Sequence, residues 1–224
     1  MITDPFVLKS LPKWHPHRLM WTAYARSKER VAALQFSSLE LPKKQIKILP
    51  NCSTNKDSTA VTGLQLSYLL AALQATESLL STAVVEIGSY RGATTKALAL
   101  ATKRRVYAVD PFIGYGGAED DFQIFLNQTS DLPNLEHLRY TSGEASRKWS
   151  YGAIGFLFID ALHDYVNTRF DIEVWGAKLA VGGLMALHDT DNRNFSGTRK
   201  AAKEAAMKMS LWAHIDDLVI LRKI

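Results

Sequence analysis

The chain has 224 residues, of which 47% are hydrophobic, and this is enough for one α/β domain with a full core and some additions. Its net charge of +5 is modest and the charges are scattered, so nucleic acid is not an expected partner. Cys52 is the only cysteine, which excludes an internal disulfide and a multi-cysteine zinc site. Neither a signal-peptide pattern nor a run of about 18 apolar residues occurs, so we expect a cytoplasmic protein without membrane contact.

Residues 1–57 are predicted to form an N-terminal cap rather than a domain, because prolines interrupt the segment repeatedly. One helix is expected over residues 24–39. Aromatic residues gather between Trp14 and Tyr24, which is more typical of packing or of a subunit contact than of a substrate cover. A homo-oligomer is therefore one expectation, and residues 58–224 are predicted to form the functional domain.

The functional domain is expected to begin with a helix over residues 63–81, where leucines recur at helical spacing. Thr62 or Ser58 would cap its first turn.

A strand, a glycine turn and a helix follow over residues 83–102. Residues 83–87 are almost entirely apolar, as in a buried parallel strand, and Gly88 and Gly92 let the backbone pass close to another group. A dinucleotide fingerprint would need three glycines, so no pyrophosphate is implied. Glu86 places a carboxylate at the end of the strand, where it could hold an ammonium or amide group of a cofactor that contains an amino acid.

This acid-x-Gly-x-x-x-Gly turn resembles the first motif of the class I methyltransferases, which use S-adenosylmethionine. The resemblance implies that the cofactor is contacted by the residues of the turn, namely Glu86, Gly88, Ser89 and Gly92. It also makes Thr62, Gly63 and Gln65 candidate contacts, although a simple helix cap is the alternative for these.

A second strand is predicted over residues 105–110 and ends in Asp110, 24 residues after Glu86. This is close to the offset of about 20 residues at which an acid meets a ribose in doubly wound folds, so Asp110 is expected to hold the ribose hydroxyls. The alternative is that Asp110 caps a turn at Pro111. The resemblance further places Phe112 beside the adenosine.

Two loops after the second strand carry further candidates. The Gly-rich acidic loop over residues 111–121, with Tyr115, is either a mobile lid or an ordinary surface loop, and a helix should follow over residues 120–129. A third strand is expected over residues 135–140. The resemblance implies that Ser142, Gly143 and Glu144 border the adenine, and the alternative is that Ser142 and Glu144 cap a helix.

Two more strands end in polar residues. The first is a nearly continuous apolar run over residues 154–160 that stops at Asp160; His163 and a helix through Lys178 follow it. The second covers residues 181–190 and ends in His188, Asp189 and Thr190. The two signatures, Phe-Ile-Asp-x-x-His-x-Tyr and Gly-Gly-Leu before His-Asp-Thr, are similar to a subgroup that includes O-methyltransferases acting on sugars and other natural-product hydroxyls. Many relatives have an acid where this chain has Leu162, so any role of that second carboxylate is in doubt.

A helix over residues 197–209 and two strands over residues 211–215 and 218–221 complete the prediction. The resemblance implies an α/β, Rossmann-like, doubly wound sheet of seven strands, mainly parallel, with the last strand antiparallel.

The candidate chemistry lies at the ends of the fourth and fifth strands. Methyl transfer to a hydroxyl needs alignment and a nucleophilic oxygen, so we expect His163 to act as general base while Asp160 and Asp189 coordinate Mg²⁺. His188 could be the base or a weak ligand instead, and strand-end acids can also merely cap the next helix.

The expected function is therefore S-adenosylmethionine-dependent O-methylation of a small-molecule hydroxyl. Two alternatives are a hydroxylase or other Rossmann-type enzyme that shares these motifs, and a non-catalytic module that keeps the cofactor fold.

Overall fold

The computed structural model describes residues 4–48, 52–55, 57–114 and 117–224. Its centre is a seven-stranded sheet in the order β3-β2-β1-β4-β5-β7-β6. The strands are β1 (Ala83–Ile87), β2 (Val106–Val109), β3 (Leu135–Leu138), β4 (Ile154–Ile159), β5 (Leu179–Leu187), β6 (Ser210–Ile215) and β7 (Leu218–Arg222). The first five are parallel, and β7 pairs antiparallel with both β5 and β6. The predicted sheet, including the antiparallel last strand, is confirmed.

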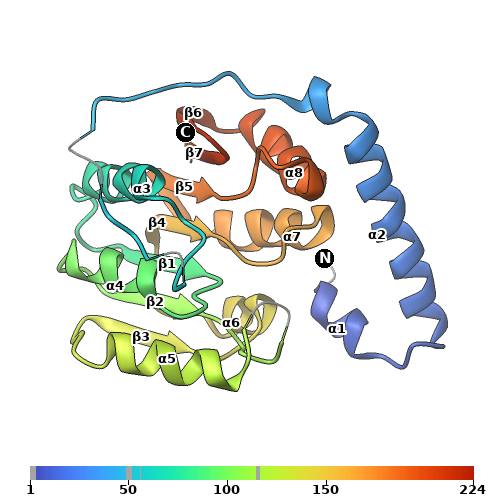
Figure 1. The fold of residues 1–224 in the computed structure, drawn as a ribbon, viewed down its shortest axis with the longest axis horizontal. Coiled ribbons are helices and arrows are strands. Elements are labelled where there is room, and N and C mark those ends of the chain that lie inside the picture. Colours follow the sequence, from blue (N-terminus) through green and yellow to red (C-terminus); the bar gives the residue numbers. More distant parts are fainter. Residues whose placement is uncertain (1–3, 49–51, 56, 115–116) are drawn as a thin grey trace.

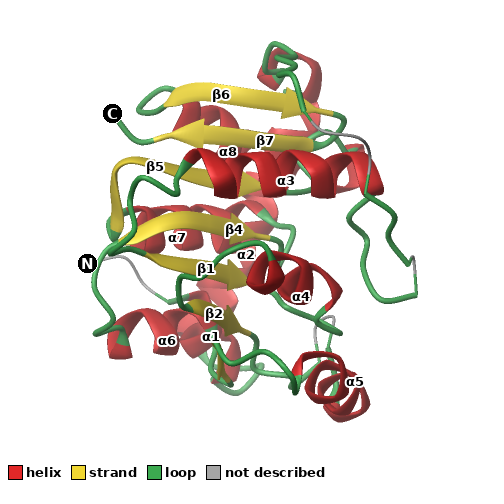
Figure 2. Cartoon of the chain, turned by 90° about the vertical axis from the view of Figure 1, so that its left-hand side faces the viewer, coloured by secondary structure: helices red, strands yellow, loops and turns green. Residues whose placement is uncertain are grey.

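Helices cover both faces of the sheet (Figure 2). One face carries α3 (Gly63–Ala75), α4 (Ala93–Leu100) and α5 (Glu119–Thr129), and the other carries α6 (Ser142–Lys148), α7 (Tyr165–Gly176) and α8 (Ser196–Ala206). Each face has its own buried apolar cluster, with Leu69 and Leu98 in one and Trp175 and Ala202 in the other. The central strand β4 is buried along its whole length, as its apolar sequence predicts.

Backbone hydrogen bonds align the carboxyl ends of four neighbouring strands. The N–H of Gly88 donates to β2 at 2.9 Å, that of Asp160 donates to β1 at 2.9 Å, and that of His188 donates to β4 at 3.2 Å. The polar residues that follow these strands therefore meet at one edge of the sheet, where ligands bind in such folds.

Several helix boundaries differ from the prediction. The helix expected over residues 24–39 begins earlier, as α2 (Pro16–Leu34), and a separate 3-10 turn, η1 (Phe36–Leu39), follows it. Pro16 stands at the first helical position, where a proline lacks an N–H that would be unpaired in any case. The lead-in helix α3 ends at Ala75 rather than near residue 81, and Thr62 does cap its start, together with Gln65.

The N-terminal segment wraps around the sheet domain (Figure 1). After α1 (Pro5–Ser10), α2 lies across α7 and α8, and the following extended segment reaches the far edge of the sheet, where Lys44 forms a backbone bridge with His214 of β6. None of the helices described is long and apolar enough to cross a membrane. Tyr115, the centre of the predicted lid, lies outside the described residues.

Candidate active site

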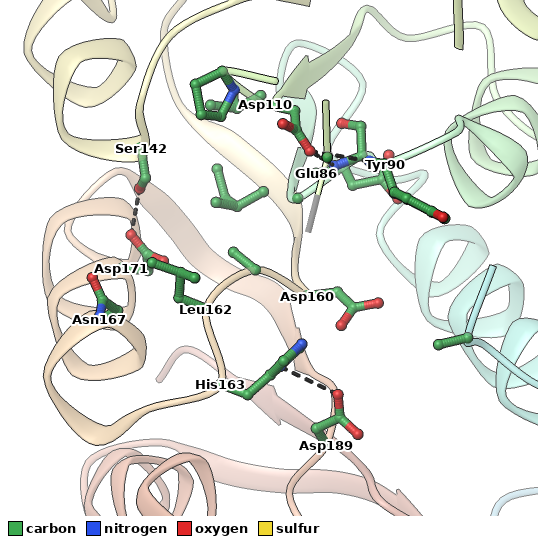
Figure 3. Close-up of a pocket in the computed structure, with 18 of the residues that line it drawn as sticks. Glu86, Tyr90, Asp110, Ser142, Asp160, Leu162, His163, Asn167, Asp171 and Asp189 are labelled. Carbon is green, nitrogen blue, oxygen red and sulfur yellow. Dashed lines mark hydrogen bonds and ion pairs between the residues drawn. The ribbon is translucent and has the colours of Figure 1, made fainter. Parts of the chain in front are cut away.

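A cavity of about 450 Å³ opens at the carboxyl ends of β1, β2, β4 and β5 (Figure 3). Most of the residues predicted from the sequence line it: Glu86, Gly88, Ser89, Asp110, Ser142, Gly143, Asp160, His163 and Asp189. The structure therefore brings together side chains from four strand ends and from the start of α6.

Gly88 is required where β1 and β4 converge. Its φ is +88°, and a Cβ atom placed there would lie 2.0 Å from the carbonyl oxygen of Asp160. No side chain fits in that space, so the turn holds Asp160 close to β1 only because residue 88 is glycine.

Asp110 accepts three backbone hydrogen bonds. One carboxylate oxygen takes the N–H groups of Ser89 and Tyr90, both at 3.1 Å, and the other takes that of Phe112 at 2.9 Å. The turn-capping role considered for Asp110 is thus present. The carboxylate also lines the cavity, and since each oxygen has two lone pairs, ribose binding stays a prediction that this capping does not exclude.

Glu86 is a buried carboxylate, 1% exposed, that lines the cavity and accepts a hydrogen bond from the hydroxyl of Thr95. Burial raises the pKa of Glu86 to about 8, although the Thr95 hydrogen bond acts to lower it. A positive group beside this carboxylate would favour its ionised form, which is the environment expected around a ligand ammonium.

Three predicted cofactor contacts lie outside the cavity. Gly92 caps α4 and faces the ring of Phe125, and Phe112 packs its ring against Phe122 and Phe125. Glu144 completes the capping box of α6 with Thr141. Gly92 and Phe112 therefore have structural roles here, and for Glu144 the helix-cap alternative describes the geometry.

Asp160, His163 and Asp189 form a cluster on the cavity wall (Figure 3). Each offers one ligand atom, and these atoms lie within 4.8 Å of one another. Nδ1 of His163 lies 3.2 Å from Oδ2 of Asp189, and its ring also packs against Phe195. Asp189 thus orients the imidazole, which leaves Nε2 as the nitrogen that could act on another group.

His188 lies behind this cluster rather than in the cavity. It is 3% exposed, and its Nδ1 lies 3.2 Å from Asp160 and 3.4 Å from Asp189. Burial acts to lower the pKa of His188, but the charges and hydrogen bonds of Asp160 and Asp189 outweigh it and raise the pKa to about 11. A buried imidazolium that pairs with both acids positions them and is poorly suited to take up a proton.

The cavity has lining residues that the sequence patterns did not reveal. Asp4 and Phe6 come from the N-terminal segment, and Asn167 and Asp171 come from α7. Asp4 bonds with Arg147 at 2.9 Å, a contact across 143 positions that no local pattern signals. Asp171 lies within α7, where the apolar periodicity predicts the helix but does not indicate that a polar residue faces a cavity.

The lining is strongly acidic: its seven acids are Asp4, Asp57, Glu86, Asp110, Asp160, Asp171 and Asp189. The lining residues that are described include neither Lys nor Arg. The cavity therefore favours a neutral or cationic ligand over an anionic one.

Comparison with known families decides the class of protein. Residues 85–190, which include the cavity residues from Glu86 to Asp189, match the family described as "Methyltransferase domain". This segment is a methyltransferase domain. The predicted resemblance to class I, the S-adenosylmethionine-dependent methyltransferases, is confirmed, and the resemblance to one subgroup of that class stays a prediction.

Solved structures share the methyltransferase fold at low sequence identity. The O-methyltransferase NovP is 16% identical with a TM-score of 0.61, over 90% of this chain and 98% of its own. An O-methyltransferase from Bacillus cereus in complex with S-adenosylhomocysteine is 15% identical with a TM-score of 0.56, over 88% of this chain and 91% of its own. An rRNA methylase from Streptococcus thermophilus is 20% identical with a TM-score of 0.53, over 74% of this chain and 98% of its own. No curated protein matches the chain.

The polar groups of the cavity fit S-adenosylmethionine. The cofactor carries a sulfonium, an ammonium and a ribose diol, and the methyltransferase cavity offers a buried carboxylate at Glu86, a half-buried one at Asp110 and neither Lys nor Arg among its described lining residues.

Proposed function

We propose that this methyltransferase transfers a methyl group to a hydroxyl oxygen of a neutral or cationic small molecule. The observation that carries the proposal is the Asp189–His163 contact of 3.2 Å beside Asp160, on the wall of the acidic cavity. The O-methyltransferases among the solved structures of the same fold support the choice of oxygen as acceptor.

Each residue of the cluster has a distinct part in the proposed reaction. S-adenosylmethionine supplies the methyl group on a positively charged sulfur. Oδ2 of Asp189 lies 3.2 Å from Nδ1 of His163 and favours a proton on that nitrogen, so Nε2 is the basic nitrogen and takes the proton of the acceptor hydroxyl. Asp160, at the end of β4, lies beside His163 and holds the acceptor oxygen in line with the methyl group.

The same acids suit a hard cation. Asp160 and Asp189 would hold it, since each offers a carboxylate oxygen within 4.8 Å of the other on the cavity wall, and Mg²⁺ prefers one or two carboxylates with water at its other positions. When bound, such an ion would lower the pKa of the acceptor hydroxyl. We include Mg²⁺ in the proposal on this chemistry alone.

Methyl transfer to a panel of hydroxyl-bearing small molecules, with labelled S-adenosylmethionine, tests the proposal. We expect His163→Ala to lower kcat by about 100-fold or more, since general bases contribute about that much. His17→Ala, an exposed histidine on α2, should have no effect. We also expect a chelator to abolish transfer and Mg²⁺ to restore it.

Three results would contradict parts of the proposal. Full activity of His163→Ala removes the general base, and full activity with chelator removes the metal. Transfer to RNA but to none of the small molecules would overturn the choice of substrate class.

A further inference from the structure

A buried carboxylate faces the cavity from α7 without a cation to balance it. Asp171 is 4% exposed and lines the cavity, and the hydroxyl of Ser142 donates a hydrogen bond to its Oδ1. Trp175 in turn donates from Nε1 to the Ser142 hydroxyl at 2.8 Å, so the pair is held rigidly. No Lys, Arg or His among the described residues forms an ion pair with Asp171.

The environment of Asp171 leaves it short of donors. Burial raises the pKa of Asp171 to about 7; the Ser142 hydrogen bond acts to lower it, and the negative charges of Asp4 and Asp164 raise it further. Oδ2 has no hydrogen-bond partner among the residues that the structure describes. Asp171 lies on the cavity wall, so a ligand can reach an oxygen that no described residue uses, and a hydrogen bond to an ionised carboxylate is a strong one.

The neighbouring polar side chain on α7, Asn167, is tied to the start of its own helix through its amide nitrogen. The Asn167 side chain donates to Asp164 at 2.6 Å, within the N-terminal turn of the helix. Asp171 is the carboxylate that α7 presents to the cavity, and Figure 3 shows it pointing toward the cavity beside Leu162.

Apolar side chains surround this acceptor. Leu162 and Phe170 line the cavity together with Phe6 of α1, a helix that packs against α7. A compartment with apolar walls and one polar atom at its edge suits a flat heteroaromatic ring, which has apolar faces and hydrogen-bonding edges.

We propose that Asp171 recognises the adenine of the cofactor by accepting a hydrogen bond from its exocyclic amino group through Oδ2. This inference rests on the proposed function for the cofactor and for the side of the cavity at which the methyl group lies. In Figure 3 the Ser142–Asp171 pair and the His163–Asp189 pair lie on different sides of the cavity. The methyl group must be at the His163 side, and Asp110 is the expected ribose ligand, so the base extends toward Asp171.

Binding of S-adenosylhomocysteine and S-inosylhomocysteine, measured by calorimetry, tests this role. The inosyl compound has a carbonyl oxygen in place of the amino group, so it would face Oδ2 with an acceptor instead of a donor. At about pH 8.5, where the Asp171 carboxyl with its pKa of about 7 is ionised and cannot donate, we expect the wild-type protein to prefer the adenosyl compound by about tenfold or more, because two acceptors facing each other are unfavourable.

Asp171→Asn is the decisive variant, because its amide can still accept from Ser142 while presenting NH₂ to the cavity. We expect it to weaken binding of the adenosyl compound about tenfold and to bind the inosyl compound as well or better, which reverses the preference. Asp57→Asn, which changes another lining carboxylate, should leave the preference unchanged. Melting of each variant without ligand verifies folding.

The outcomes separate this inference from the proposed function. Equal binding of both compounds by the wild-type protein overturns the role of Asp171, and this result needs no variant. An Asp171→Asn protein that keeps the adenosyl preference but has a raised KM for the acceptor assigns Asp171 to the acceptor and also overturns it. Wild-type protein that binds neither compound contradicts the cofactor itself.

Discussion

Gly88 illustrates at the scale of one residue how a missing side chain shapes the site. A Cβ atom there would meet the backbone oxygen of Asp160 at 2.0 Å, and the φ of +88° is unfavourable for any other residue. Gly152 has a similar φ, +85°, but nothing lies within 4 Å of its Cβ position. The two glycines therefore differ in steric contact while their φ angles are nearly the same.

We predict that Gly88→Ala is much more destabilising than Gly152→Ala. The Gly152 variant should lose about 1 kcal/mol, the cost of a left-handed backbone, and the Gly88 variant should lose roughly 2 kcal/mol more, because strand ends must move apart. Urea denaturation measures both changes. Equal losses would mean that β1 and β4 separate easily at this point.

The two histidines near the site show what single residues reveal in a sequence and what they do not. His163 and His188 were both candidates because each lies beside a strand-end acid. Burial distinguishes them: the His163 side chain is 30% exposed at the cavity, whereas that of His188 is 3% exposed behind the acids. A sequence predicts that both histidines lie near strand ends, but it does not say which of the two side chains faces the cavity.

At the scale of elements, α2 stabilises the helices that follow the catalytic strands. The carboxylate of Glu29 accepts a hydrogen bond from the N–H of Tyr165, at the start of α7, and lies against Gly197, at the start of α8. A carboxylate is favourable at a helix N-terminus, and here one side chain serves two.

We therefore predict that Glu29→Ala lowers the free energy of unfolding by about 1 to 2 kcal/mol, the usual cost of a lost helix cap. Arg26→Ala, on an exposed position of the same helix, is the matched control and should change stability by less than about 0.5 kcal/mol. Thermal and urea denaturation provide the measurement. Equal effects of the two substitutions would argue against a capping role for Glu29.

At the scale of the whole molecule, the sheet was predictable because each strand has a local signal. The apolar runs before Gly88 and Asp160 and the hairpin at Asp216 are readable without any long-range information. The path of residues 4–48 was not, since its anchors are contacts such as Asp4 with Arg147 and Lys44 with His214, made between segments far apart in the sequence. For the same reason the acids at the strand ends were found, and Asp4 and Asp171 were not.

The charge of the whole molecule and the charge of its cavity have opposite signs, and this predicts how salt affects binding. The net charge is +5, yet the lining carries seven acids and, among its described residues, no Lys or Arg. S-adenosylmethionine has one positive charge more than S-adenosylhomocysteine, so the field of these carboxylates should favour the former, and screening should weaken that preference. Raising the ionic strength from about 0.05 M to about 0.5 M, with chelator present, should weaken S-adenosylmethionine binding several-fold more than S-adenosylhomocysteine binding in calorimetry. The comparison cancels effects common to both ligands, such as changes in hydrophobic contacts. The same salt dependence for both ligands would contradict this prediction. It would mean that the cavity acids are neutralised when the cofactor binds, and that the positive surface outside the cavity sets the field.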